Sequence, residues 1–196
     1  VPKAVRSLTS PFEFNNLASL AQLFEDHPGE FAGVIMEPMN IDRPADGFLE
    51  DVLEICRVQG ALLIFDETIT GFRFDPGGAQ ALFNVTPDLS TFGKGLANGM
   101  PLSAVVGRRD LMVKMEDIFF SGTFGGETLS LAAAAAVLDF IQREPVTSYL
   151  ETEGQYLQES VNALLVESGC SEFLTLKGHP AWQILEWATT SKFDIW

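Results

Sequence analysis

Hydrophobic residues recur three or four positions apart in several segments of the chain, which is the spacing of an amphipathic helix. This spacing predicts four long helices, over residues 17–26, 48–59, 127–143 and 146–168. Turn-forming residues mark the ends of the first three: the run His27-Pro28-Gly29, then Gly60, then Pro145. We therefore expect four helices, the first of which is amphipathic with one face on the core.

Short uninterrupted apolar runs lie between these helices. They predict buried strands over residues 31–36 and 61–65, and another apolar strand over 103–107. A further strand-like segment begins at Pro87 and leads to Lys94. A short helical pattern covers 79–83, and residues 109–112 begin another short helix. Because strands and helices alternate along the chain, we expect an α/β fold with a mostly parallel sheet.

The composition indicates a soluble globular protein. The chain has 196 residues, of which 46% are hydrophobic, and this is enough for a sizeable core. No apolar stretch is long enough to cross a bilayer core of roughly 30 Å. The net charge is −15, from 12 Lys and Arg against 27 Asp and Glu, and basic clusters that would bind a phosphate backbone are absent from the sequence. We expect no membrane segment and no nucleic-acid partner.

The two cysteines, Cys56 and Cys170, lie far apart in the sequence and have no histidine cluster near them. Neither a disulfide framework nor a metal site is indicated, and a reducing cytoplasm fits this pattern best. The first residues, Val1-Pro2-Lys3, lack both an initiator methionine and the layout of a signal peptide. We expect the chain to begin inside a longer protein.

Two acidic residues fall at the carboxyl ends of predicted strands, Glu37 after the first and Asp66 after the second. Ligands of open parallel sheets bind beyond these ends. Asp66 could pair with the protonated ring nitrogen of pyridoxal phosphate, a cofactor that needs a fixed anion. It could also simply cap the turn that follows it, which is common for an acid at a strand end.

A single lysine, Lys94, stands between two glycines in the segment Phe92-Gly93-Lys94-Gly95. A lysine held as the neutral amine attacks a carbonyl carbon and forms a Schiff base. A solvated side chain on a glycine-rich loop is the commoner case when the local sequence is considered alone. The segment lacks the spacing of a nucleotide phosphate loop, so that explanation is not economical.

Thr123 follows Gly122 in a glycine-rich stretch just before the third long helix. Hydroxyl and free backbone N–H groups at such a place suit a phosphate group. An ordinary turn that caps the helix explains the same residues equally well.

Four motifs stand in a fixed order along the chain. They are Met36-Glu37-Pro38, the run 65–73, the run 91–95 with Gly99-Met100-Pro101-Leu102, and the run 122–126. Together they resemble the class III pyridoxal-phosphate-dependent aminotransferases over nearly the whole chain. Within that family, Thr70-Gly71-Phe72-Arg73 and Gly78-Ala79-Gln80 look most like glutamate-1-semialdehyde 2,1-aminomutase and its close relatives.

The resemblance implies the large domain of a fold-type I pyridoxal-phosphate-dependent transferase, a mostly parallel sheet flanked by helices. That domain would take in residues 1–145, and residues 146–196 would form a connecting helix and the beginning of a C-terminal small domain. It also implies pyridoxal 5'-phosphate as cofactor and a homodimer as the assembly. Lys94 would form the Schiff base and shuttle the proton, and Asp66 would pair with the pyridinium nitrogen.

Four further positions follow from the same resemblance. Thr123, with Gly122, would bind the cofactor phosphate, in this family typically across the subunit interface. Thr68 and Ile69 would line the cofactor ring, where the family commonly has valine at the first position and glutamine or methionine at the second. The segment 39–44 also lacks the glycine-containing continuation frequent in relatives.

Three functions follow as hypotheses. The first is amino transfer between an amino compound and a keto or aldehyde acceptor through Lys94. The second is intramolecular amino transfer of the aminomutase type. The third, from a different class, is a non-catalytic fragment or pseudoenzyme that serves as a dimerising structural module, because the regions that would complete the pocket lie outside this chain.

Overall fold

The computed structural model describes residues 1–188, so the predicted segment 146–196 extends beyond the described residues. The elements follow one another as α1 (Lys3–Arg6), α2 (Leu17–Asp26), β1 (Gly33–Met36), α3 (Phe48–Gln59), β2 (Leu62–Asp66), α4 (Ala79–Leu82), β3 (Leu89–Phe92), η1 (Lys94–Leu96), β4 (Ala104–Gly107), α5 (Arg109–Met112), η2 (Val113–Glu116), α6 (Thr128–Arg143), α7 (Val146–Glu167), β5 (Leu174–His179) and β6 (Trp182–Trp187). The helices and strands predicted from the sequence before residue 168 are confirmed, with bounds that shift by one or two residues.

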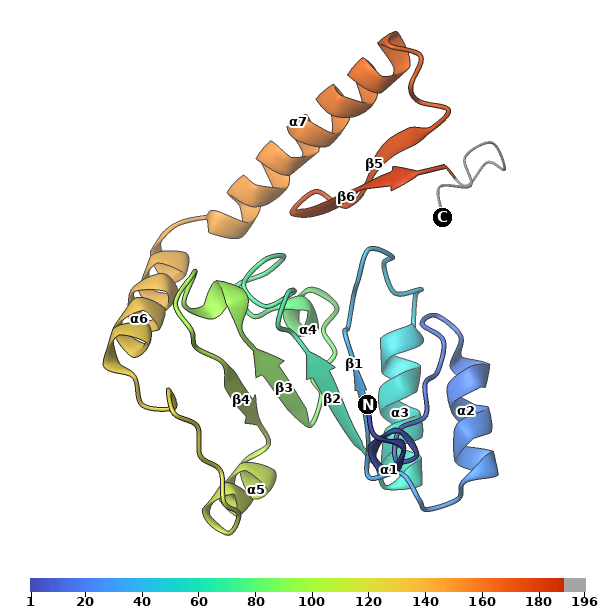
Figure 1. Cartoon of the computed structure of the whole chain (residues 1–196), viewed down its shortest axis with the longest axis vertical. Coiled ribbons are helices and arrows are strands. Elements are labelled where there is room, and N and C mark those ends of the chain that lie inside the picture. Colours follow the sequence, from blue (N-terminus) through green and yellow to red (C-terminus); the bar gives the residue numbers. More distant parts are fainter. Residues whose placement is uncertain (189–196) are drawn as a thin grey trace.

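Four strands form one sheet in the order β1-β2-β3-β4 (Figure 1). The first three strands are parallel, and β4 runs antiparallel to β3. The mostly parallel sheet predicted from the alternation of strands and helices is confirmed.

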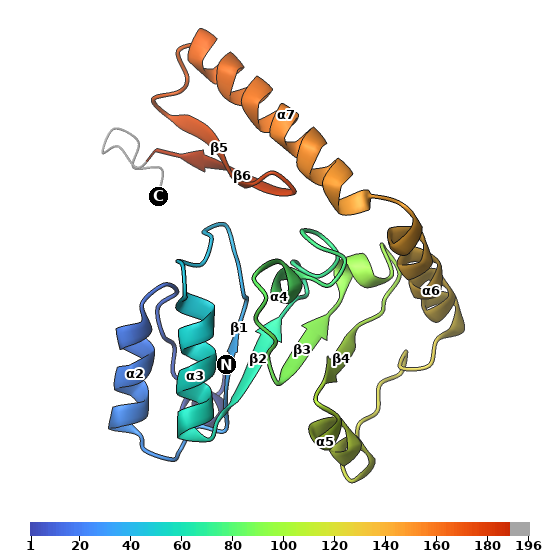
Figure 2. The ribbon, with the colours of Figure 1, turned by 180° about the vertical axis from the view of Figure 1, so that it is seen from behind.

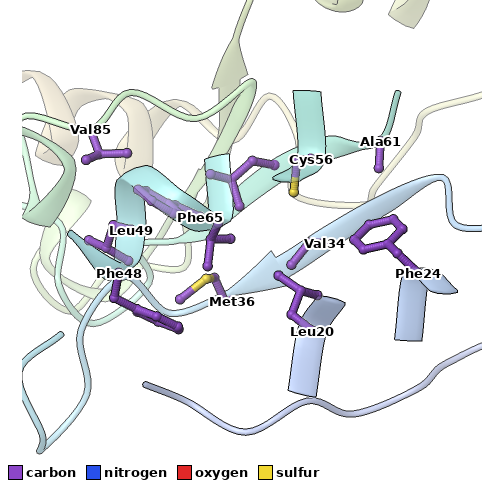
Figure 3. Packing of buried hydrophobic residues seen from close by; sticks show 12 residues of the cluster. Leu20, Phe24, Val34, Met36, Phe48, Leu49, Cys56, Ala61, Phe65 and Val85 are labelled. Atoms are coloured by element: carbon purple, nitrogen blue, oxygen red, sulfur yellow. The ribbon is translucent and has the colours of Figure 1, made fainter. Parts of the chain in front are cut away.

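The main core lies between this sheet and the helices α2 and α3. Side chains of β1 point at Leu20 and Phe24 of α2, and Phe65 of β2 packs towards Leu49 of α3 (Figure 3). Helix α3 ends where the sequence predicts, because Gly60 takes the left-handed conformation with φ of 70° and the next N–H, of Ala61, returns to the Cys56 carbonyl.

The prediction that residues 31–36 form a strand buried on both faces is wrong. Burial alternates along β1, and the side chain of Ile35 is 60% exposed. The reason is that α2 and α3 pack on the face of β1 that carries Val34 and Met36, while Ile35 lies on the other face.

A second, two-stranded sheet follows α7, and the hydrophobic pattern did not predict it. Strands β5 and β6 pair antiparallel, and the Asn162 side chain of α7 bonds both the N–H and the carbonyl of Leu176 at 2.9 Å. Figures 1 and 2 show α7 and this hairpin beyond the carboxyl ends of β1, β2 and β3.

The hairpin turn docks on the loop between β2 and α4. Arg73 donates from Nη1 to the carbonyl of Ala181 at 2.8 Å. The Phe74 ring lies 4.4 Å from the His179 ring and stacks on Trp182 at 6.5 Å. These contacts hold the second sheet over the carboxyl edge of the first. The boundary at residues 145 and 146 remains a prediction.

Among residues 1–188, no helix combines the length and the apolar character that a membrane crossing requires.

Two valines of α3 provide a matched test of the core. Val52 is 0% exposed and Val58 is 72% exposed on the same helix. We expect Val52→Ala to lower the free energy of unfolding by about 2 kcal/mol, because it leaves a cavity, and Val58→Ala to change it by less than about 0.5 kcal/mol. Urea denaturation followed by circular dichroism measures both. Equal losses for the two variants would contradict the core described above.

Candidate active site

The parallel register of the first three strands brings three candidate residues to one edge of the sheet. Met36 of β1 lies opposite Phe65 of β2, so the next residues along the two strands are Glu37 and Asp66. Asp66 in turn pairs with Thr91 of β3. Lys94 follows β3 closely, at the first position of η1. The strand ends therefore gather an amine and two carboxyl groups from distant parts of the sequence.

Asp66 is half-buried and held by two hydroxyl-bearing residues. Its Oδ1 accepts from the Thr68 backbone N–H at 3.0 Å and from the Thr91 hydroxyl at 3.1 Å. Burial alone would raise the pKa of this carboxyl, but the hydrogen bonds from Thr68 and Thr91 and the charge of Lys94 outweigh it, so the pKa lies below its usual value. Asp66 does cap its turn, as the alternative interpretation held, and it is also kept as an anion.

Lys94 is exposed among the described residues and has an unusual backbone. Its φ is 42°, in the left-handed region that residues with a Cβ seldom adopt. The preceding residue packs closely on the turn after Asp66, because a Cβ on Gly93 would stand 3.3 Å from the Thr68 Cγ2 atom. The Asp66 turn and the Lys94 segment are thus in close contact, and the strained backbone marks a site worth testing for function.

Glu37 is the third ionisable group at this edge. Burial, followed by the negative charge of Asp66, raises its pKa above the usual value, and Lys94 opposes this only partly. The charges of Asp66 and Lys94 thus both act on the Glu37 carboxyl. Two carboxyl groups in one site therefore have pKa values that are driven in opposite directions.

The other predicted residues divide into two groups. Thr68 and Ile69 lie in the turn directly after Asp66, partly buried, and so belong to the same edge. Gly122 and Thr123 lie on an exposed loop before α6, and within residues 1–188 no hydrogen bond joins them to Asp66 or Lys94. Figure 1 shows this loop on the outer side of β4, away from β1.

The interpretation of Thr123 as the cap of α6 is wrong. Glu127 is the N-cap, because its side chain accepts from the N–H groups of Leu129 and Ser130, both at 2.7 Å. Thr123 instead lies in a separate turn in which the Gly125 N–H bonds the Gly122 carbonyl at 3.1 Å. Its hydroxyl is free of that capping role.

Sequence reasoning missed two residues of the site. The sequence patterns do not single out Thr91, which comes to lie opposite Asp66 because β2 and β3 pair in parallel. Glu67, the residue after Asp66, is fully buried and accepts hydrogen bonds from across the following loop. Neither residue stands out in a hydrophobicity pattern. Within the described part of the chain, no group of three or more His, Cys, Asp or Glu could hold a metal ion.

The Thr91 hydroxyl gives a direct test of this geometry. We expect Thr91→Val to raise the pKa of Asp66 towards its ordinary value, because one donor to the anion is lost. A carboxyl whose pKa is lowered on folding adds stability at neutral pH that disappears as the pH falls through the folded pKa, so the variant should lose less stability on acidification. Carbon-detected NMR titration of the Asp66 carboxyl checks the shift.

Thr175→Val is the matched control, since Thr175 is an exposed strand threonine of β5. It should leave the Asp66 titration unchanged. An unaltered Asp66 titration in Thr91→Val would contradict the hydrogen-bonded arrangement.

Sequence comparison relates the chain to proteins of known name. The sequence profile of the family "Aminotransferase class-III" matches residues 6–174. The chain is 39% identical over 180 residues to a glutamate-1-semialdehyde 2,1-aminomutase of Syntrophobacter fumaroxidans, covering 88% of this chain and 42% of that protein. It is also 39% identical over 172 residues to a glutamate-1-semialdehyde 2,1-aminomutase 2 of Lachnoclostridium phytofermentans, covering 84% and 40%. The chain therefore spans less than half the length of these relatives.

Solved structures share the fold. One is the FumI protein of Sphingopyxis sp. MTA144 in its pyridoxal-phosphate form, with a TM-score of 0.90 at 27% identity, over 96% of this chain and 47% of that one. Another is an omega-transaminase from Sphaerobacter thermophilus, with a TM-score of 0.85 at 28% identity, over 96% and 44%. The predicted fold class, that of the pyridoxal-phosphate-dependent transaminases, is confirmed. The family profile matches most of the chain, and the motifs that hold Glu37, Asp66 and Lys94 meet at one edge of the sheet, so the chain belongs to the class III aminotransferase family.

Proposed function

We propose that this chain is part of an enzyme that uses pyridoxal 5'-phosphate to transfer an amino group between an amino compound and a keto or aldehyde acceptor. The observation that carries the proposal is the meeting of Asp66 and Lys94 at adjoining strand ends, where the charge of Lys94 lowers the pKa of Asp66. The family and the pyridoxal-phosphate-bound transaminase structures that share the fold support it.

The residues at this edge fit the cofactor in chemical type. A carboxylate with a lowered pKa stays ionised at neutral pH and suits the protonated nitrogen of a pyridine ring. The close approach of Gly93 to Thr68 brings the segment of the lysine against the turn that follows the acid. Thr68 and Ile69, which adjoin Asp66, would contact the ring.

Each residue then has one role. When bound, pyridoxal phosphate acts as an electron sink for the bond broken at the substrate carbon. Asp66 holds the ring nitrogen protonated, and Thr68 and Thr91 hold Asp66. Lys94 would hold the cofactor through its side-chain amine, and its Nζ atom would remove and return the proton of the substrate carbon.

A second candidate is intramolecular amino transfer, as in an aminomutase. Two relatives that carry that name are 39% identical to the chain, which favours it. A single turnover with an amino donor separates the two functions. A transaminase releases a keto product, whereas a mutase returns the amino group to another carbon of the same molecule. The donor itself is not specified by the residues at the strand ends.

The lysine provides the first test. We expect the wild-type protein to develop the absorption band of a lysine-bound cofactor on addition of pyridoxal phosphate, and Lys94→Ala to lose it completely. Lys114→Ala, which changes an exposed lysine of η2, is the control and should keep the band. Identical spectra for wild type and Lys94→Ala would refute the assignment and favour a non-catalytic dimerising module.

We further propose that the enzyme acts as a homodimer in the cytoplasm. The loop that carries Gly122 and Thr123 exposes large apolar side chains, of which Phe119 is 97% and Phe120 is 72% exposed. Such a patch suits burial against a second copy. Thr123, on the same loop, would then reach the cofactor phosphate of the partner's site. The two cysteines are free thiols, which suits a reducing compartment.

Substitution of that patch tests the assembly. We expect the double variant Phe119→Ser with Phe120→Ser to weaken dimerisation at least about tenfold, because fully buried aromatic side chains dominate interface energies. Sedimentation velocity over a concentration series measures the change. Val58→Ser, at an exposed position of α3, serves as control. A wild-type protein that stays monomeric at every concentration would contradict the proposal.

A further inference from the structure

Glu67, the residue after Asp66, carries a buried carboxyl group that has no role in the proposed amino transfer. The Glu67 side chain is 0% exposed. Its Oε2 accepts from the Ala79 N–H at 2.8 Å and from the Thr70 hydroxyl, and its Oε1 accepts from the Gln80 N–H at 2.7 Å. Both oxygens are therefore used as acceptors, and the group ties the start of the 67–80 loop to its end.

The backbone opposite Glu67 is shaped for this carboxyl group. Gly78 has φ of 82°, and a Cβ built on it would stand 2.7 Å from each Glu67 oxygen. A side chain at position 78 would collide with Glu67, so the loop can close around the carboxyl only with glycine there. The Glu67 side chain is therefore buried, has a hydrogen bond on each carboxyl oxygen and fits against Gly78.

The same residue anchors the turn that carries the donor to Asp66. The Gly71 N–H bonds the Glu67 carbonyl at 2.8 Å, and a Cβ on Gly71 would overlap the Phe92 ring of β3. Thr68, whose N–H donates to Asp66, is the residue directly after Glu67. The turn that donates to Asp66 is thus held on one side by the hydrogen bonds of Glu67 and on the other by its close packing on Phe92 of β3.

We propose that Glu67 is a positioning residue: by fixing the turn over residues 67–71, it orients the Thr68 N–H towards Asp66 and so sets the direction in which Asp66 faces the cofactor ring. This role rests on the proposed function, since it assigns Glu67 to the support of a ring-binding acid. Glu67 itself points into the loop, and its contacts are with Thr70, Ala79 and Gln80.

Glu67→Gln is the informative variant. It keeps the size of the side chain but replaces one acceptor oxygen by an NH2 group, which would face a backbone N–H or the Thr70 hydroxyl. Asp88→Asn is the matched control. Asp88 also uses both oxygens, one for the Leu63 N–H at 2.8 Å and one for Arg108 at 2.7 Å, but it precedes β3 at the opposite end of the strands.

Two readouts are measured on both variants. The first is the pKa of Asp66 in the protein without cofactor, by NMR titration. The second is the dissociation constant of pyridoxal phosphate, from the band that depends on Lys94. We expect Glu67→Gln to raise the Asp66 pKa and to weaken cofactor binding about tenfold. Asp88→Asn should leave both unchanged, even if it lowers the melting temperature.

The outcomes separate this proposal from the proposed function. A wild-type protein that forms no lysine-bound cofactor overturns the function, and the Asp66 titration then still tests the positioning role. Unchanged Asp66 titration and cofactor affinity in folded Glu67→Gln overturn the positioning role alone. If Glu67→Gln does not fold, Thr70→Val, which removes the hydroxyl donor alone, takes its place. It should shift both readouts in the same direction by a smaller amount, and no shift overturns the proposal.

Discussion

The site depends on the parallel pairing of β1, β2 and β3. Parallel strands end at the same edge of a sheet, so residues that are almost thirty positions apart in sequence, such as Glu37 and Asp66, come to adjoin. The packing of α2 and α3 on one face keeps the register fixed, because a shift of one residue would turn Leu63 and Phe65 out of the core. By fixing the register, the hydrophobic core therefore determines which charged side chains adjoin at the site.

The loop after β2 connects the site to the rest of the chain. At its start, Glu67 closes the loop on itself, and further along, Arg73 and Phe74 hold the β5–β6 hairpin over the edge of the main sheet. The turn after Asp66 is consequently tied both to its own loop and to the second sheet. Asp66 therefore keeps one orientation. A carboxylate that is fixed in this way is preorganised to stabilise a positive charge.

Much of this arrangement could be predicted from the sequence. Period and turn residues located α2, α3, α6 and α7, because their boundaries are marked by His27, Gly60 and Pro145. The motifs around Asp66 and Lys94 identified the family. The hairpin could not be found in this way, since β5 and β6 are partly exposed and are held by Asn162, Arg73 and Phe74 from distant segments. Nor could the role of Glu67, whose partners Ala79 and Gln80 donate through the backbone, which every residue type carries. The loop of Thr123 lies apart from Asp66 in the single chain, so its place in the site depends on an assembly that the sequence suggests only through the family.

The meeting of Asp66 and Lys94 on one cofactor is tested most directly by a crystal structure of the protein with pyridoxal phosphate. If the strand ends form the site, electron density will continue from the Lys94 Nζ atom into the cofactor, and the Asp66 carboxylate will lie within hydrogen-bonding distance of the ring nitrogen. Cofactor bound away from β2 and β3, or a Lys94 side chain with no bond to it, would contradict the proposed site.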